Sequence, residues 1–202
     1  MKHLPNTLTI LRIVLIPTYM AAMYAKGTYT NQLACLLFVI AASTDWLDGY
    51  LARKYKLVTN FGKILDPVAD KIMVAAAMIV LVDIHRLAAW IVILMLFRDF
   101  AVGALRDLAA SQGTIIAAGI WGKLKTVLQM VSLSLLIFYD NLIIWPLSRF
   151  GIYLTDGISV TGFISIPFYD IGMVLMYIAL VASIFSGVIY FKQFYGKVAT
   201  NL

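Results

Sequence analysis

Apolar runs of about twenty residues recur along the chain, and short polar segments separate them. About twenty apolar residues are what an α-helix needs to cross the hydrocarbon core of a bilayer. Six runs have this character: Leu8–Ala25, Leu33–Leu51, Pro67–Ile84, Ala88–Leu105, Thr126–Trp145 and Asp170–Phe191. The pattern therefore predicts an all-α membrane protein with about six transmembrane helices, folded as a single domain over residues 1–202.

Composition and charge support a membrane location. Hydrophobic residues make up 62% of the 202 residues, far more than in a typical soluble domain. With a cytoplasmic N-terminus, thirteen of the 16 lysines and arginines lie on the cytoplasmic side, leaving Lys26, Arg86 and Arg149 opposite. The positive-inside rule thus predicts that both termini face the cytoplasm, in the cell's inner (cytoplasmic) membrane. The net charge of +6 suits anionic headgroups and phosphate substrates, while no soluble module is available to bind nucleic acid.

Four aspartates gather around the turn between the second and third runs. Asp45 and Asp48 are three residues apart, and Asp66 and Asp70 are four apart, so on helices each pair projects from one face. Clustered carboxylates repel one another unless cations neutralise them, and ligation by oxygen alone favours Mg²⁺ or Mn²⁺. The pairs predict a site for two divalent cations on the cytoplasmic side. The alternative, helix capping with salt bridges, needs only one aspartate at each helix start.

Small residues accompany the acidic pairs. Gly49 and Ala52 share the helix face of the first pair, and Gly62 stands four residues before Asp66. Such a strip either lets two helices pack closely or leaves room for an extended substrate, and beside the aspartates we favour the substrate. Pro67, directly after Asp66, fits the first turn of the third helix.

A second, basic constellation follows in the fourth and fifth runs. It comprises Arg98, Arg106, Lys123 and Lys125, and an aspartate follows each arginine. One interpretation is positive-inside topology with local ion pairs. The other is a phosphate clamp, because guanidinium groups at membrane depth are costly unless they line a wet cavity.

These residues match a known family pattern. This chain resembles the CDP-alcohol phosphotransferase family and fills all eight fixed positions of its signature. The matching residues are Asp45-x2-Asp48-Gly49-x2-Ala52-Arg53-x8-Gly62-x3-Asp66-x3-Asp70. The segments 4–12, 98–106 and 122–126 resemble the branch of that family that makes phosphatidylglycerophosphate. Asp99 departs from the branch, in which we expect a glutamate after the arginine.

The resemblance implies an enzyme of phospholipid biosynthesis. It implies transfer of a phosphatidyl group from CDP-diacylglycerol to glycerol-3-phosphate, giving phosphatidylglycerophosphate and CMP, by a homodimer in which Asp70 is both a metal ligand and the general base. The residues implied to contact CDP-diacylglycerol are Asn6, Thr9, Gly49, Ala52, Arg53, Thr59 and Gly62. Those expected to bind glycerol-3-phosphate are Arg98, Arg106, Lys123 and Lys125.

Other functions remain open. A family member with inositol phosphate, serine or phosphatidylglycerol as the acceptor would carry the same eight positions. A transporter with a carboxylate-lined ion site would place its acids near mid-span and show internal repeats, whereas these acids lie at one face. A non-catalytic scaffold would have no reason to assemble four aspartates.

Overall fold

The computed structural model describes residues 4–25, 29–55, 60–113, 119–138, 153–154, 158–160, 164–166 and 168–197. Side chains are described for residues 11–25, 29–44, 68–113, 119–138 and 168–196. The described helices are α1 (Leu4–Tyr24), α2 (Thr30–Tyr55), α3 (Asn60–Asp83), α4 (Ala89–Ser111), α5 (Ile120–Phe138) and α6 (Phe168–Lys197). Three short strands precede α6: β1 (Tyr153–Leu154), β2 (Ile158–Val160) and β3 (Ile164–Ile166). The predicted helical fold is confirmed, and the strands are an addition to it.

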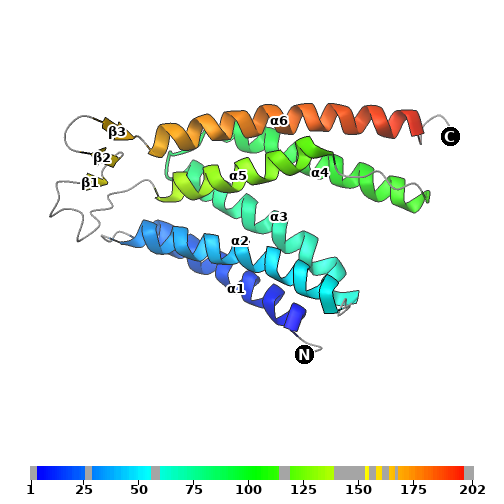
Figure 1. Ribbon diagram of the computed structural model, residues 1–202, viewed down its shortest axis with the longest axis horizontal. Helices are drawn as coiled ribbons and strands as arrows, with labels where there is room; N and C mark the ends of the chain where they lie inside the picture. Colours follow the sequence, from blue (N-terminus) through cyan, green and yellow to red (C-terminus); the bar gives the residue numbers. More distant parts are fainter. Residues whose placement is uncertain are drawn as a thin grey trace.

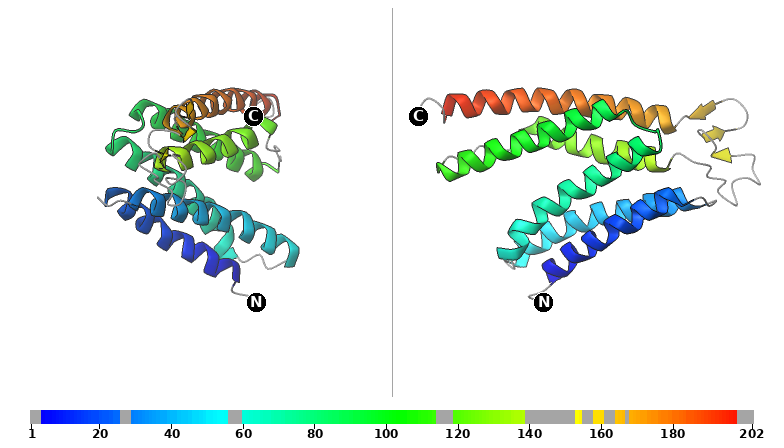
Figure 2. Two further views of the ribbon diagram at one scale, coloured as in Figure 1. Left: turned by 60° about the vertical axis from the view of Figure 1, so that its left-hand side comes forward. Right: turned by 180° about the vertical axis from the view of Figure 1, so that it is seen from behind.

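The helices form two groups that meet near the strands and diverge toward the opposite end (Figure 1). α1 packs along α2, and α5 packs along α6. α3 contacts α1, α4 and α5, so it connects the two groups. Figure 2 shows α3 running obliquely from the end of α2 toward the start of α4. The ends of α2, α4 and α6 and the starts of α1, α3 and α5 therefore lie away from the sheet.

The strands form a small antiparallel sheet in the order β1-β2-β3. Ser159 of β2 lies opposite Tyr153 of β1 and Ser165 of β3. The sequence predicted no strand here, because strands of two or three residues are too short to show an alternating pattern. The sheet lies far from the diverging ends of the helices (Figure 1).

Side chains from α1, α2 and α3 form one part of the core. Tyr19 is fully buried and its hydroxyl donates a 2.6 Å hydrogen bond to the carbonyl of Met73. The Tyr19 ring meets the edge of Phe38 with centroids 5.7 Å apart. A buried phenol needs such an acceptor, since an unpaired hydroxyl in an apolar core is costly. The tyrosine thus fixes α1 against both neighbouring helices.

Large apolar side chains also cover the exterior. On α6 alone, Val174, Val181, Phe185 and Phe191 are each at least half exposed. α5 and α6 are long and apolar enough to cross a membrane by length and composition. An apolar exterior of this extent is typical of a protein surrounded by lipid.

Two helices begin six or seven residues earlier than predicted. α3 begins at Asn60, so Pro67 lies inside the helix and not in its first turn. A proline inside a helix removes one backbone hydrogen bond and crowds the preceding turn, yet α3 continues through it. α5 begins at Ile120 rather than Thr126, which places Lys123 and Lys125 on its first two turns.

Candidate active site

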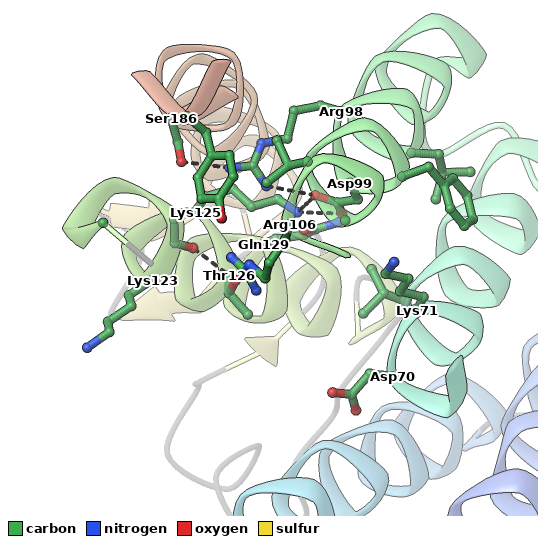
Figure 3. A pocket seen from close by; sticks show the side chains of 18 of the residues that line it. Asp70, Lys71, Arg98, Asp99, Arg106, Lys123, Lys125, Thr126, Gln129 and Ser186 are labelled. Carbon is green, nitrogen blue, oxygen red and sulfur yellow. Dashed lines mark hydrogen bonds and ion pairs between the residues drawn. The ribbon is translucent and has the colours of Figure 1, made fainter. Parts of the chain in front are cut away.

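A cavity of about 710 Å³ opens between α3, α4, α5 and α6 (Figure 3). Asp70 lines it from α3, and the predicted basic residues Arg98, Arg106, Lys123 and Lys125 line it from α4 and α5. The structure therefore brings together one predicted carboxylate and all four predicted phosphate-binding cations, although they are far apart in sequence. α6 completes the wall with polar side chains that include Ser186 and Tyr190.

Asp99 organises two of the four cations. Its carboxylate accepts hydrogen bonds from Lys125 Nζ at 2.7 Å and 2.6 Å, and from Arg98 Nη1 at 3.2 Å. Lys125 is only 4% exposed, so this pairing compensates the loss of its hydration. We call Arg98, Asp99 and Lys125 the Asp99 cluster. Two cations against one anion leave the cluster with one net positive charge.

The Asp99 cluster also joins α4 to α6. The Nε atom of Arg98 donates to the carbonyl of Ser183 at 3.0 Å, and its Nη2 atom donates to Oγ of Ser186 at 2.6 Å. A planar guanidinium can make these bonds while it pairs with Asp99, because its five N–H groups point in different directions. The guanidinium is therefore fixed in orientation by groups from two helices.

The other cations of the cavity have different surroundings. The Arg106 guanidinium lies 5.5 Å from the centre of the Tyr190 ring. Lys123 extends from α5 away from the Asp99 cluster (Figure 3). Lys71, next to Asp70 on α3, also lines the cavity. Among the described residues, none of these three cations has a carboxylate oxygen within 4.0 Å.

Asp70 has a buried partner. Its Oδ1 atom accepts a 2.9 Å hydrogen bond from Nη1 of Arg12, and the two groups form an ion pair. Arg12 is fully buried, whereas 41% of the Asp70 side chain is exposed. A guanidinium in an apolar environment is stable only with such a partner, and it holds the carboxylate at the cavity edge.

The structure places the remaining predicted residues on helices without describing their side chains. Asp45, Asp48, Gly49, Ala52 and Arg53 lie on the last turns of α2, Gly62 and Asp66 on the first two turns of α3, and Asn6 and Thr9 on α1. Thr59 lies outside the described residues. Among the side chains that are described, no three His, Cys, Asp or Glu residues gather, and three of the four predicted metal ligands are not among them.

Sequence reasoning missed several residues of the site. It gave no role to the lining residues Lys71, Ser186 and Tyr190, or to Arg12, which pairs with Asp70. An arginine inside an apolar run was a signal for a buried ion pair, and the paired serines of α6 at positions 183 and 186 were a weaker signal for a polar face. Nothing in the local pattern showed that this face meets Arg98.

Comparison with known proteins gives a consistent result. Residues 2–185 match the CDP-alcohol phosphatidyltransferase family. A Rickettsia typhi protein is 38% identical over 192 residues, covering 95% of this chain and 97% of its own length. Proteins of Bacillus subtilis (43% over 152 residues) and Escherichia coli K12 (41% over 145 residues) each cover 69% of this chain and 79% of their own length. All three are named CDP-diacylglycerol–glycerol-3-phosphate 3-phosphatidyltransferase. With the signature positions filled and the match extending over most of its length, this chain belongs to the CDP-alcohol phosphatidyltransferase family.

Proposed function

We propose that this protein transfers the phosphatidyl group of CDP-diacylglycerol to glycerol-3-phosphate, giving phosphatidylglycerophosphate and CMP. The relatives described above carry the name of this reaction. The observation that carries the proposal is the cavity, in which the predicted base faces a surplus of cations. A phosphate monoester such as glycerol-3-phosphate bears a charge of about −1.5 to −2 at neutral pH, so it fits this surplus.

The acidic residues suit divalent metal ions. Asp45, Asp48, Asp66 and Asp70 supply only carboxylate oxygens, the donor set that Mg²⁺ and Mn²⁺ prefer. Two such cations, when bound, would neutralise the diphosphate of the donor and stabilise charge on the attacking and leaving oxygens. The end of α2 and the start of α3 lie at the same end of the molecule, which supports a shared site (Figure 1).

Asp70 acts as the general base in this proposal. It accepts the proton of the acceptor hydroxyl, whose oxygen then forms a bond to the lipid-side phosphorus of CDP-diacylglycerol. The bond from that phosphorus to the bridging oxygen breaks, and CMP leaves. Arg12 fixes the carboxylate by its 2.9 Å hydrogen bond and so restricts the directions from which the hydroxyl can approach.

The cations of α4 and α5 bind the phosphate of the acceptor. Arg106 and Lys123 have N–H groups available for it, since no carboxylate oxygen of the described residues lies within 4.0 Å of either. Arg98 and Lys125 contribute the net positive charge of the Asp99 cluster. Hydrogen bonds between ionised partners of this kind are about twice as strong as neutral ones.

In this proposal, the nucleotide end of CDP-diacylglycerol binds residues other than those that bind the phosphate of the acceptor. By analogy with the family, we assign its contacts to Asn6, Thr9, Gly49, Ala52, Arg53, Thr59 and Gly62. The enzyme works as a multi-pass homodimer in the inner membrane, with both termini and the cavity on the cytoplasmic side. The excess of lysines and arginines at that side supports this orientation.

The test is release of CMP by the purified full-length protein in detergent, with CDP-diacylglycerol and a panel of acceptors. We expect turnover with glycerol-3-phosphate to exceed that with serine, inositol phosphate or phosphatidylglycerol. EDTA should abolish turnover, and Mg²⁺ or Mn²⁺ should restore it, because four carboxylates facing a diphosphate would otherwise repel it. Asp70→Asn, which keeps the shape but removes the base, should lose most of the turnover.

Each part of the proposal can be contradicted by a different result. Preference for any of the other three acceptors would overturn the choice of glycerol-3-phosphate and leave the family unaffected. Full turnover in metal-free buffer would overturn the two-metal site. Near-native turnover by Asp70→Asn would mean that another group takes the proton.

A further inference from the structure

Lys71 places an ammonium group on the cavity wall next to Asp70, and the proposed reaction so far gives it no role. Both residues come from α3, line the cavity, and lie across it from the Asp99 cluster (Figure 3). Lys71 is near the middle of α3, and its neighbours Val68 and Ile72 are exposed apolar residues. An ammonium group among such neighbours is costly unless it reaches water or an anion. The cavity gives the ammonium group access to water and has room for an anion.

α4 provides a specific place for this ammonium group. A Cβ atom on Gly103 would lie 2.8 Å from Nζ of Lys71 and 3.9 Å from its Cε. Any residue other than glycine at position 103 would therefore displace the ammonium group. One turn earlier, the ring of Phe100 lies with its centre 5.3 Å from Nζ. The electron-rich face of the ring attracts the ammonium group of Lys71. A carboxylate would accept hydrogen bonds from the N–H groups of Lys71, but the ring does not occupy them in this way. The three N–H donors of Lys71 therefore stay available to a ligand in the cavity.

Building on the proposed function, we propose that Lys71 binds the phosphate group of the acceptor, together with Arg106 and Lys123, and that Gly103 keeps its ammonium in place. Glycerol-3-phosphate carries its phosphate and its free terminal hydroxyl at opposite ends of three carbons. Successive residues of a helix point about 100° apart, so Lys71 and Asp70 can hold the two ends of one small molecule. Lys71 then orients the acceptor hydroxyl toward the base as well as binding the phosphate.

The experiment measures KM and kcat for both substrates, with the full-length protein in detergent and Mg²⁺ present. Lys71→Gln should raise the KM for glycerol-3-phosphate by about ten- to a hundredfold, the loss expected for one charge-assisted contact, and leave the KM for CDP-diacylglycerol largely unchanged. Gly103→Ala should raise the same KM by a smaller factor, because the added methyl displaces the flexible end of a side chain and not the backbone. Free glycerol, used as a poor phosphate-free acceptor, should lose little of its kcat/KM in either variant.

Two matched variants serve as controls. Lys192→Gln removes the same charge from an exposed position of α6 that does not line the cavity. Gly196→Ala adds the same methyl group near the end of α6, where a Cβ atom would meet nothing within 4 Å. Both should keep the wild-type KM for glycerol-3-phosphate. Thermal unfolding in detergent should show all four variants folded.

Three results would overturn the role of Lys71. They are an unchanged KM for glycerol-3-phosphate in Lys71→Gln, an equal loss with glycerol and glycerol-3-phosphate, or a change confined to the KM for CDP-diacylglycerol. The last would assign the ammonium to the diphosphate of the donor. If the wild-type protein releases no CMP with glycerol-3-phosphate, the proposed function fails first and the role of Lys71 falls with it.

Discussion

At the scale of single residues, the cavity depends on one carboxylate that neutralises part of its positive charge. Asp99 pairs with both Arg98 and Lys125, and Lys125 is almost fully buried. Both interpretations of the sequence therefore have support here. Arg98 takes part in a local ion pair, and it also lines a cavity with three further predicted cations. The partner of Lys125 could not be predicted, because it depends on how α4 and α5 are rotated about their axes.

Asp99→Asn should therefore destabilise the fold. Without the carboxylate, two cations face each other and the buried ammonium of Lys125 loses its counter-ion. Because the Asp99 side chain is 22% exposed, we expect a loss of about 1–3 kcal/mol in the free energy of unfolding, below that of a fully buried pair. A lower unfolding temperature in detergent would show it.

Asp107→Asn is the matched control for this prediction. Asp107 also lies on α4 and lines the cavity, but it is exposed. Its replacement should leave the unfolding temperature nearly unchanged. The double variant Asp99→Asn with Lys125→Met should recover part of the lost stability, since it removes the uncompensated ammonium. Equal unfolding temperatures for the wild type and Asp99→Asn would contradict a stabilising role of the cluster.

At the scale of elements, apolar run length predicted the helices well and their ends poorly. All six predicted spans overlap a described helix, and α6 (Phe168–Lys197) extends beyond its predicted span at both ends. A helix can continue into polar residues near a membrane surface. These residues are not part of the apolar run, so hydropathy does not show where the helix ends. The start of α3 illustrates the error, because seven helical residues, from Asn60 to Asp66, precede the predicted boundary at Pro67.

Hydropathy also does not reveal which helices contact each other, or at which residues. α5 and α6 approach closely at Gly172, whose carbonyl accepts a 2.7 Å hydrogen bond from Oγ of Ser132. A Cβ atom on Gly172 would lie 3.1 Å from Cδ2 of Leu136 and 3.3 Å from Cβ of Leu135. The second neighbour is fixed to the backbone of α5 and cannot move alone. Gly172 therefore sets the distance between the two helices.

Gly172→Val should force α5 and α6 apart. Overpacking of this kind costs about 1–3 kcal/mol, so the unfolding temperature in detergent should fall. Gly196→Val is the matched control, because it introduces the same branched residue near the end of α6 into open space. If the two variants unfold at the same temperature, only helix propensity is affected and the close contact at Gly172 has no energetic importance.

At the scale of the whole molecule, the cavity lies where the two groups of helices diverge. The ends of α2 and α4 and the starts of α3 and α5 surround this region, and the small sheet lies at the other end (Figure 1). The predicted metal ligands and the predicted phosphate-binding cations therefore lie at one end of the protein. The sequence predicted this arrangement from alternation of the helices alone. It could not predict the shape of the cavity, because Lys71, Gly103 and Ser186 come from three different helices and line one cavity only in the folded chain.

The proposed orientation of the whole molecule in the membrane rests on the charge distribution of the sequence and can be tested on α4. This helix runs from Ala89 to Ser111, about 34 Å at 1.5 Å per residue, which is enough to cross the hydrocarbon core. Both end residues are exposed. Because the positive-inside rule assigns thirteen of the 16 lysines and arginines to the cytoplasmic side, Ser111 should face the cytoplasm and Ala89 the opposite side.

Cysteine labelling distinguishes the two sides. Cys35, the single cysteine of the chain, is replaced first by alanine, and Ala89→Cys or Ser111→Cys is then introduced. A membrane-impermeant maleimide added to intact bacterial cells should label Ala89→Cys, whereas Ser111→Cys should react only after the membrane is opened. CMP release by both variants in membranes would show that the labelled protein is active. Labelling of Ser111→Cys in intact cells would place the cavity on the outer side, where cytoplasmic glycerol-3-phosphate could not reach the cations of α4 and α5, and the proposed orientation would be wrong.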